Sequence, residues 1–204
     1  MRIKTLVSWL ASLSFVAAGV ALMILFFVDG GQTTATNKDD LAGFNVPKTG
    51  NAGDTQEVGG PEDKTLKLTI PKMSRIDDDT VPDAAGDDTE TLDDNAAIHL
   101  EGTGFPWQDE ANVYLAGHRL GYPGTDSLLA FYDQKKLDDG DKIYVTDSEG
   151  TEYTYRVFDE FVVKPTNLSV TEPVKGKNIL TLQTCTLPNY TERIITRAEL
   201  VSVA

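Results

Sequence analysis

Cysteine, histidine and basic residues are all scarce in this sequence, and each scarcity narrows what the protein can be. The 204 residues include one cysteine, Cys185, so no disulfide can form within the chain. The 18 Lys and Arg residues are outnumbered by 32 Asp and Glu residues, which gives a net charge of −14. Nucleic acid is therefore excluded as a partner, because phosphate binding needs clustered Lys and Arg. The simplest interpretation of the negative net charge is that it keeps the protein soluble, because copies of the chain repel one another.

Long apolar runs are also rare, and the one present lies at the N-terminus. Residues Thr5–Val28 carry no charge, and a helix of this length spans the roughly 30 Å core of a bilayer. Arg2 and Lys4 precede the run and Asp29 follows it, so the positive-inside rule predicts a cytoplasmic N-terminus, residues 1–4, and an extracellular remainder. A cleaved signal peptide is the alternative, but the run is too long and no small-residue cleavage site follows it. We predict an uncleaved signal anchor in the cell membrane, crossing once.

The remainder of the chain divides into a linker and one domain. Residues 29–64 are rich in Gly, Thr, Asn, Asp and Lys and show almost no apolar periodicity, which predicts a flexible extracellular linker. Residues 65–204 are expected to form one catalytic domain that is mainly β, a closed or nearly closed barrel with short helices. Strands are predicted at 66–71, 113–117, 142–146, 153–163, 178–185 and 193–203, a hairpin turn at 147–151 and a short helix at 127–132.

The segment from Asp77 to Asp94 is dense in carboxylates. Calcium is a candidate ligand for such a segment, but the spaced acidic loop of calcium-binding hands is missing. A solvated acidic loop is the simpler interpretation. We therefore expect no cofactor and no metal, and the pattern does not support calcium.

Three residue types point to acyl transfer. A lone thiol on an exported chain is a reactive group, an intermolecular link or an inert core residue. Cys185 would act as a thiolate nucleophile, and His118, which closes an apolar run, would serve as general acid and base. Arg193 would stabilise the developing oxyanion. If residues 186–192 form a loop, Cys185 and Arg193 lie at facing ends of consecutive strands and project to one mouth of the barrel.

The sequence around these residues resembles the sortase family, the cysteine transpeptidases of Gram-positive surfaces. The Thr181–Cys185 run with Arg193 matches the family's TLxTC…R signature, and Ala116–Arg119 is similar to its catalytic-histidine strand. Further agreement lies in His99–Gly104 with Asn112, in Leu68–Lys72 and in Leu137–Ile143. The resemblance covers residues 66–204. The Gly-His-Arg form, the N-terminal anchor and the absence of a C-terminal membrane segment look most like class E, with class D next.

The resemblance implies a sortase-like closed eight-stranded β-barrel and a specific reaction. Cys185 would cleave a C-terminal LPxTG- or LAxTG-type sorting signal between Thr and Gly and form a thioester. A cell-wall amine on a lipid II-type peptidoglycan precursor would then receive the exported protein. His118 and Arg193 would be the other catalytic residues, and Thr184 would help to position substrate or oxyanion. Class E members are associated with LAxTG signals.

Three further residues of the resembling segments have side chains that suit catalysis or binding. Arg197 is a rival to Arg193, but only Arg193 lies at the loop end of its strand. His99 is interpreted as structural or substrate-lining. On a strand, the side chains of the adjacent residues His118 and Arg119 point to opposite faces, so we expect Arg119 to make a surface salt bridge or a loop contact.

Other functions stay open at this point. Papain-like peptidases place the cysteine before the histidine, and L,D-transpeptidases have a Ser-x-Gly-Cys context that Cys185 lacks. A pilus-polymerising sortase is one alternative, and a non-enzymatic membrane-anchored binding or adaptor domain is another. The adaptor predicts an inert thiol, whereas the transpeptidase predicts a reactive and partly exposed one.

Overall fold

The computed structural model describes residues 59–204, which are organised around a single sheet of nine strands. Residues 5–28, the predicted membrane span, and most of the predicted linker lie outside the described part. Within residues 59–204, no helix has the length and apolar character needed to cross a membrane. The strands are β1 (Leu66–Thr69), β2 (Asp79–Val81), β3 (Asp83–Ala84), β4 (Ile98–Leu100), β5 (Ala111–Ala116), β6 (Lys142–Thr146), β7 (Glu152–Val163), β8 (Asn178–Cys185) and β9 (Arg193–Val203).

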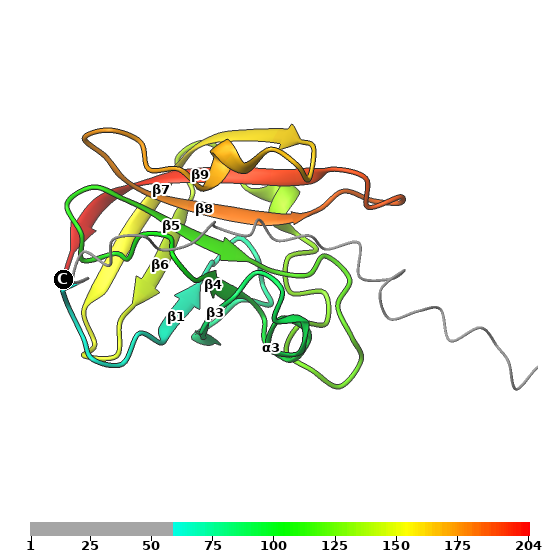
Figure 1. Cartoon of the computed structure of the whole chain (residues 1–204), viewed down its shortest axis with the longest axis horizontal. Coiled ribbons are helices and arrows are strands. Elements are labelled where there is room, and N and C mark those ends of the chain that lie inside the picture. The colour runs from blue at the N-terminus through cyan, green and yellow to red at the C-terminus, as the bar shows by residue number, and fades with distance from the viewer. Residues whose placement is uncertain (1–58) are drawn as a thin grey trace, which may run out of the picture. The chain divides into compact units, whose positions relative to one another are not determined.

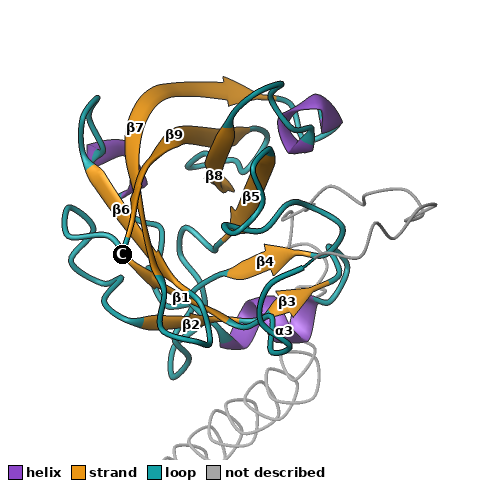
Figure 2. Ribbon diagram, turned by 90° about the vertical axis from the view of Figure 1, so that its left-hand side faces the viewer, coloured by secondary structure: helices purple, strands orange, loops and turns teal. Residues whose placement is uncertain are grey.

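The sheet closes into a barrel at Pro82. Its strand order is β2-β1-β6-β7-β9-β8-β5-β4-β3, so β2 and β3 form the two ends of the sheet. Only Pro82 separates these two strands in the chain, and its carbonyl accepts a hydrogen bond from the His99 amide at 2.8 Å. The strands accordingly surround a common core (Figures 1 and 2). The expected eight-stranded barrel is recovered when β2 and β3 are counted as one strand interrupted by a proline, which has no amide proton for the ladder.

His99 strengthens this closure. Its ring is fully buried, with Nδ1 2.7 Å from an Asp83 carboxylate oxygen and Nε2 2.9 Å from the Gly104 carbonyl oxygen. Asp83 lies on β3 and His99 on β4, and the two residues are also partners in the parallel pairing of these strands. His99 is therefore structural, because its side chain supplements a pairing that extends over only two residues on β3.

Alternation along the central strands separates two apolar clusters. Val113 and Leu115 on β5, with Leu180 and Leu182 on β8, point into the barrel core. Tyr114, Ala116 and Cys185, on the opposite face of these two strands, belong to the second cluster. Its other members are Ala84, Leu92, Ile98, Leu100, Val170 and Ile195. All of β8 is buried because both of its faces are covered. Each large aliphatic side chain buried in this way contributes about 1.5–3 kcal/mol.

A helix lies where the sequence suggested only an acidic loop. Helix α3 (Thr89–Asp94) follows β3, and its N-cap Asp88 accepts hydrogen bonds from the Thr91 amide at 3.1 Å and the Thr91 hydroxyl at 2.7 Å. This side-chain cap satisfies one of the amides that a helix start leaves without a partner. The only other helices in residues 59–204 are the 3₁₀ turns η2 (Gln134–Lys136) and η3 (Leu168–Thr171).

The short helix predicted at 127–132 was wrong, and this segment is a series of turns. Leu129 has a positive φ of 56°, which no right-handed helix accommodates. The Leu129 amide donates to the Leu120 carbonyl at 2.8 Å, and the Phe131 amide donates to the His118 carbonyl at 3.0 Å. The segment therefore satisfies its amides by packing back onto the loop that follows His118.

Candidate active site

The three predicted catalytic residues lie at one end of the barrel. Cys185 is the last residue of β8 and Arg193 the first of β9, and the two are direct partners in the antiparallel register, as the sequence suggested. β5 runs parallel to β8, with Ala116 opposite Gln183. His118 follows the end of β5 by two residues. Since the carboxyl ends of parallel strands meet at one edge, His118 and Cys185 emerge side by side.

Gly117 allows the chain to reach His118 through a crowded passage. A Cβ at this position would lie 2.8 Å from the Ala96 carbonyl oxygen and 2.8 Å from a ring carbon of Phe131. The Gly117 amide donates to the Gln183 carbonyl at 3.0 Å, which extends the β5–β8 ladder by one residue. The absence of a side chain at Gly117 is thus what permits His118 to be placed beside β8.

Thr184 braces this passage. Its side chain is fully buried, and its hydroxyl donates to the Gly117 carbonyl at 2.8 Å. Thr184 also alternates with Cys185 along β8, so the two side chains leave opposite faces of the strand. In this structure the Thr184 hydroxyl holds the segment that leads from β5 to His118. A role for Thr184 in positioning substrate or oxyanion stays a prediction.

We therefore expect Thr184→Val to be destabilised by about 1–2 kcal/mol, since it leaves the buried Gly117 carbonyl without this donor. Thr184→Ser, which keeps the hydroxyl, is the matched control. Chemical denaturation of both variants and the wild type measures the difference. Equal stability of Thr184→Val and the wild type would contradict the bracing role.

Cys185 is more buried than the sequence suggested. Its exposed fraction is 3%, and it packs in the second apolar cluster with Tyr114, Ala116 and Ile195. The expectation of a partly exposed thiol was therefore wrong for this structure. Burial raises the pKa of the Cys185 thiol, and the positive charge of Arg193 opposes that rise. Substrate must then reach a thiol whose charged form depends on its cationic neighbours.

Arg193 is held by the loop that joins β8 to β9. One guanidinium nitrogen, Nη1, donates to the carbonyls of Tyr190 and Glu192, both at 3.0 Å. The side chain is buried, with 1% exposed. The rival Arg197 lies further along β9, opposite Thr181, where its guanidinium covers the Phe161 ring at 5.3 Å. Arg193 is therefore the guanidinium fixed next to the thiol.

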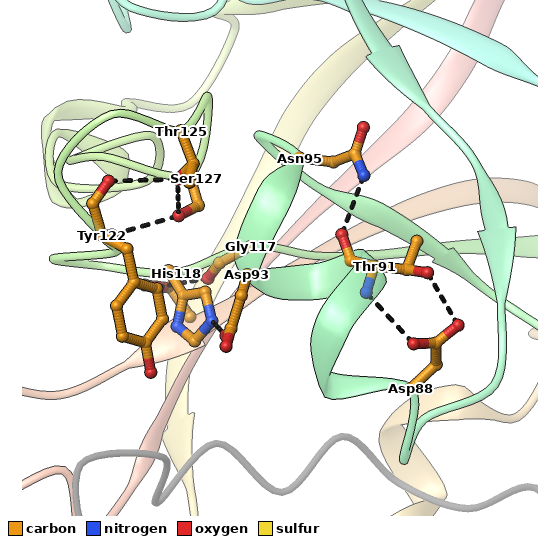
Figure 3. Close-up of polar contacts among 10 residues, drawn as sticks. Asp88, Thr91, Asp93, Asn95, Gly117, His118, Tyr122, Thr125 and Ser127 are labelled. Atoms are coloured by element: carbon orange, nitrogen blue, oxygen red, sulfur yellow. Dashed lines mark hydrogen bonds and ion pairs between the residues drawn. The ribbon is translucent and has the colours of Figure 1, made fainter. Parts of the chain in front are cut away.

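Sequence reasoning missed a fourth residue, Asp93. Figure 3 shows its carboxylate against the His118 ring, with Oδ1 2.9 Å from Nε2. Both residues are buried, and Tyr122 meets the imidazole edge-on with ring centroids 5.5 Å apart. Burial lowers the pKa of His118, and the hydrogen bond and charge of Asp93 act in the opposite direction. The signal that could have indicated α3, and hence Asp93, was Asp88 as a capping residue with the acidic Glu90 in the first turn.

Arg119 makes a contact with the loop that follows it. Its guanidinium lies over the Tyr132 ring, with 5.8 Å from Cζ to the ring centroid. It also opposes the rise in the pKa of Cys185, to a smaller extent than Arg193. Of the two contacts expected from the sequence, a salt bridge or a loop contact, the structure has the latter.

The carboxylates of the acidic segment, residues 77–94, each contact a different partner. Asp78 pairs with Lys67 at 2.6 Å, Asp83 with His99, Asp88 with Thr91 and Asp93 with His118. Across residues 59–204, no three His, Cys, Asp or Glu side chains gather closely enough to hold a metal ion. The segment is therefore built into the fold around the site and is not a simple solvated loop.

Comparisons with known proteins agree with this geometry. The family model described as the sortase domain matches residues 68–201, more than half of the chain. Sortase A of Streptococcus agalactiae is 40% identical over 90 residues, which is 44% of this chain and 36% of that relative, so the match spans little more than a third of the relative's length.

Solved sortase structures share the fold. Sortase C2 of the group B Streptococcus pilus island 1 aligns with a TM-score of 0.57 and 30% identity, over 70% of this chain and 77% of that one. Sortase A from Corynebacterium diphtheriae aligns with a TM-score of 0.58 and 27% identity, over 69% and 62%. Sortase D5 from Clostridium perfringens gives 0.57 and 26%, over 69% and 80%. The chain belongs to the sortase family, whose members are cysteine transpeptidases.

Proposed function

We propose that this protein is a membrane-anchored sortase that cleaves a C-terminal sorting signal between Thr and Gly and transfers the protein to a cell-wall amine. The observation that carries the proposal is the register pair of Cys185 and Arg193 beside the His118 strand. Anchoring through residues 5–28, an extracellular catalytic domain and the lipid II-type acceptor are parts of the same proposal, supported by the sequence. The LAxTG preference of class E is the substrate hypothesis to test against LPxTG.

The first half-reaction forms the thioester. The Cys185 thiolate adds to the Thr carbonyl carbon, and the developing oxyanion faces the Arg193 guanidinium. When the tetrahedral intermediate collapses, the Thr–Gly carbon–nitrogen bond breaks. The His118 imidazolium gives its proton to the departing Gly amine, so the leaving group departs neutral.

The second half-reaction reverses these steps with a new amine. The acceptor amine adds to the thioester carbonyl and loses a proton to the His118 imidazole. The carbon–sulfur bond then breaks, and the Cys185 thiolate is restored with its imidazolium partner. Water in place of the amine would give hydrolysis, so the covered position of Cys185 favours transfer by limiting water at the thioester.

The test is a cleavage and transfer assay with the full chain in detergent micelles. Fluorogenic LAxTG and LPxTG peptides are offered with and without an amine acceptor that mimics the wall precursor. We expect cleavage between Thr and Gly and a new amide-linked product, identified by mass. If neither peptide is cleaved and the folded protein forms no thioester, the adaptor alternative replaces the enzyme.

A pilus-polymerising role is the second candidate, favoured by the 30% identity to a pilus-island sortase. In that reaction the acceptor is an amine of another pilin subunit, and lysine is the side chain that carries a primary amine. Comparing a lysine-containing peptide with a wall-precursor amine in the same assay separates the two roles, because the favoured acceptor gives the faster transfer.

A further inference from the structure

The carboxylate of Asp93 is well placed to act on the chemistry of His118. Helix α3 presents Asp93 from its last turn, and the exposed fractions of Asp93 and His118 are 7% and 8%. The 2.9 Å contact between Oδ1 and Nε2 is a hydrogen bond of ordinary length between two buried side chains. Charge-assisted hydrogen bonds in such surroundings are roughly twice as strong as neutral ones. The pair therefore fixes the plane of the imidazole ring as well as its charge preference.

Within residues 59–204, His118 is bordered by α3, by the loop that follows it and by the facing ends of β8 and β9. Asp93 faces it from α3, and Tyr122 lies edge-on from the loop that follows it. Cys185 ends the neighbouring strand β8, and Arg193 begins β9 opposite Cys185. Among residues 59–204, Asp93 is thus the carboxylate in hydrogen-bond contact with the ring. The imidazolium donates its proton in the first half-reaction and is formed again in the second, and burial disfavours it while Asp93 favours it.

We propose that Asp93 is a positioning residue, which binds Nε2 of His118, sets the ring orientation and stabilises its protonated form. The other ring nitrogen, Nδ1, then donates the proton to the Gly amine and accepts one from the acceptor amine. This inference rests on the proposed transpeptidation, in which His118 must be an acid in one half-reaction and a base in the other. Asp93 itself touches no reacting atom.

Removing the charge gives an expected result with a defined sign. Asp93 opposes the lowering of the His118 pKa by burial, so Asp93→Asn lowers that pKa further. At low pH the Cys185 thiol and the His118 ring are both protonated, and catalysis stops. Because burial raises the pKa of the thiol and lowers that of the ring, the first proton is lost at the pKa of His118, so the acid limb of the pH–rate profile moves to lower pH in Asp93→Asn. The plateau rate falls by at least about tenfold, because the thiolate–imidazolium pair is less populated. A variant that merely disturbed the fold would lower the rate at every pH and leave the position of the acid limb unchanged.

The experiment uses the full chain with matched variants. Asp93→Asn is compared with Asp93→Glu, which restores the charge, and with Asp94→Asn, which removes a neighbouring exposed carboxylate. The chain has two histidines, so NMR of the labelled imidazoles follows His118 against His99 without any substrate. Melting curves verify that each variant is folded.

We expect the His118 titration to move to lower pH in Asp93→Asn only, with part of the activity recovered in Asp93→Glu. An unmoved titration, or full activity in Asp93→Asn, overturns the proposal. Because the NMR titration needs no turnover, it distinguishes failure of this role from failure of the proposed transpeptidation.

Discussion

Cys185→Ala is expected to abolish formation of the covalent intermediate. Wild-type protein incubated with a sorting-signal peptide and no acceptor gains the mass of the peptide up to Thr, and hydroxylamine releases it as expected for a thioester. The alanine variant gains nothing, and its turnover falls by at least about 10⁴-fold, because no other cysteine can replace the nucleophile. Intact-protein mass spectrometry gives the result directly.

The control for this experiment is Cys185→Ser, which keeps the volume of the buried side chain. Its hydroxyl is far harder to ionise than a thiol, so we expect no adduct on the time scale of the wild type. Simple alkylation is a poorer test, because burial slows reagent access and raises the pKa of the thiol. An adduct that survives in the alanine variant would show that the nucleophile is another residue.

Arg193→Ala is expected to lower kcat/KM by about 10²–10³-fold, the usual loss when a preorganised oxyanion donor is removed. Arg193→Lys recovers little, because a single ammonium cannot both bind the Tyr190 and Glu192 carbonyls, as Nη1 does, and present further donors to the oxyanion. Losing the guanidinium also removes the largest effect that lowers the Cys185 pKa. The thiol should therefore titrate at higher pH in both variants, more so in the alanine variant.

The matched control is Arg197→Ala, on the same strand and the same face. Arg197 covers Phe161 and lies opposite Thr181, away from the thiol, so kcat/KM should stay within about threefold of the wild type. The pH dependence of Cys185 alkylation is measured in Arg193→Ala, Arg193→Lys and Arg197→Ala, and melting curves show whether each is folded. Together these measurements distinguish the loss of a charge near the thiol from the loss of the fold. Equal losses in Arg193→Ala and Arg197→Ala would contradict a specific role for Arg193.

The long strands were readable from sequence because their signals are local. β6, β8 and β9 coincide with the predicted ranges 142–146, 178–185 and 193–203, since each is a run of β-forming residues bounded by turn residues. The facing of Cys185 and Arg193 followed from the short loop between β8 and β9. When a short loop joins two consecutive strands, few alternative pairing registers are possible between them.

What the sequence left hidden depends on contacts between distant segments. His118 and Asp93 are 25 residues apart, and their pairing depends on where a six-residue helix lies relative to the end of β5. The same is true of Thr184, whose hydroxyl bonds a carbonyl 67 residues away. The burial of Cys185 also arises from packing across several strands. No periodicity within a single segment encodes such contacts.

The proline closure restricts how this barrel can admit a substrate. Val81 and Asp83 are two residues apart, so the ends of the sheet stay within about 7 Å of each other whatever the solvent or ligand. The circumference is fixed by covalent bonds, and the barrel cannot widen by parting its first and last strands. Any breathing that uncovers Cys185 must therefore come from what surrounds the strands, such as α3 and the loop between β8 and β9. The strands are thus the rigid part of the barrel, and α3 and the loop between β8 and β9 are the part that can move. Cys185 lies on one of the rigid strands.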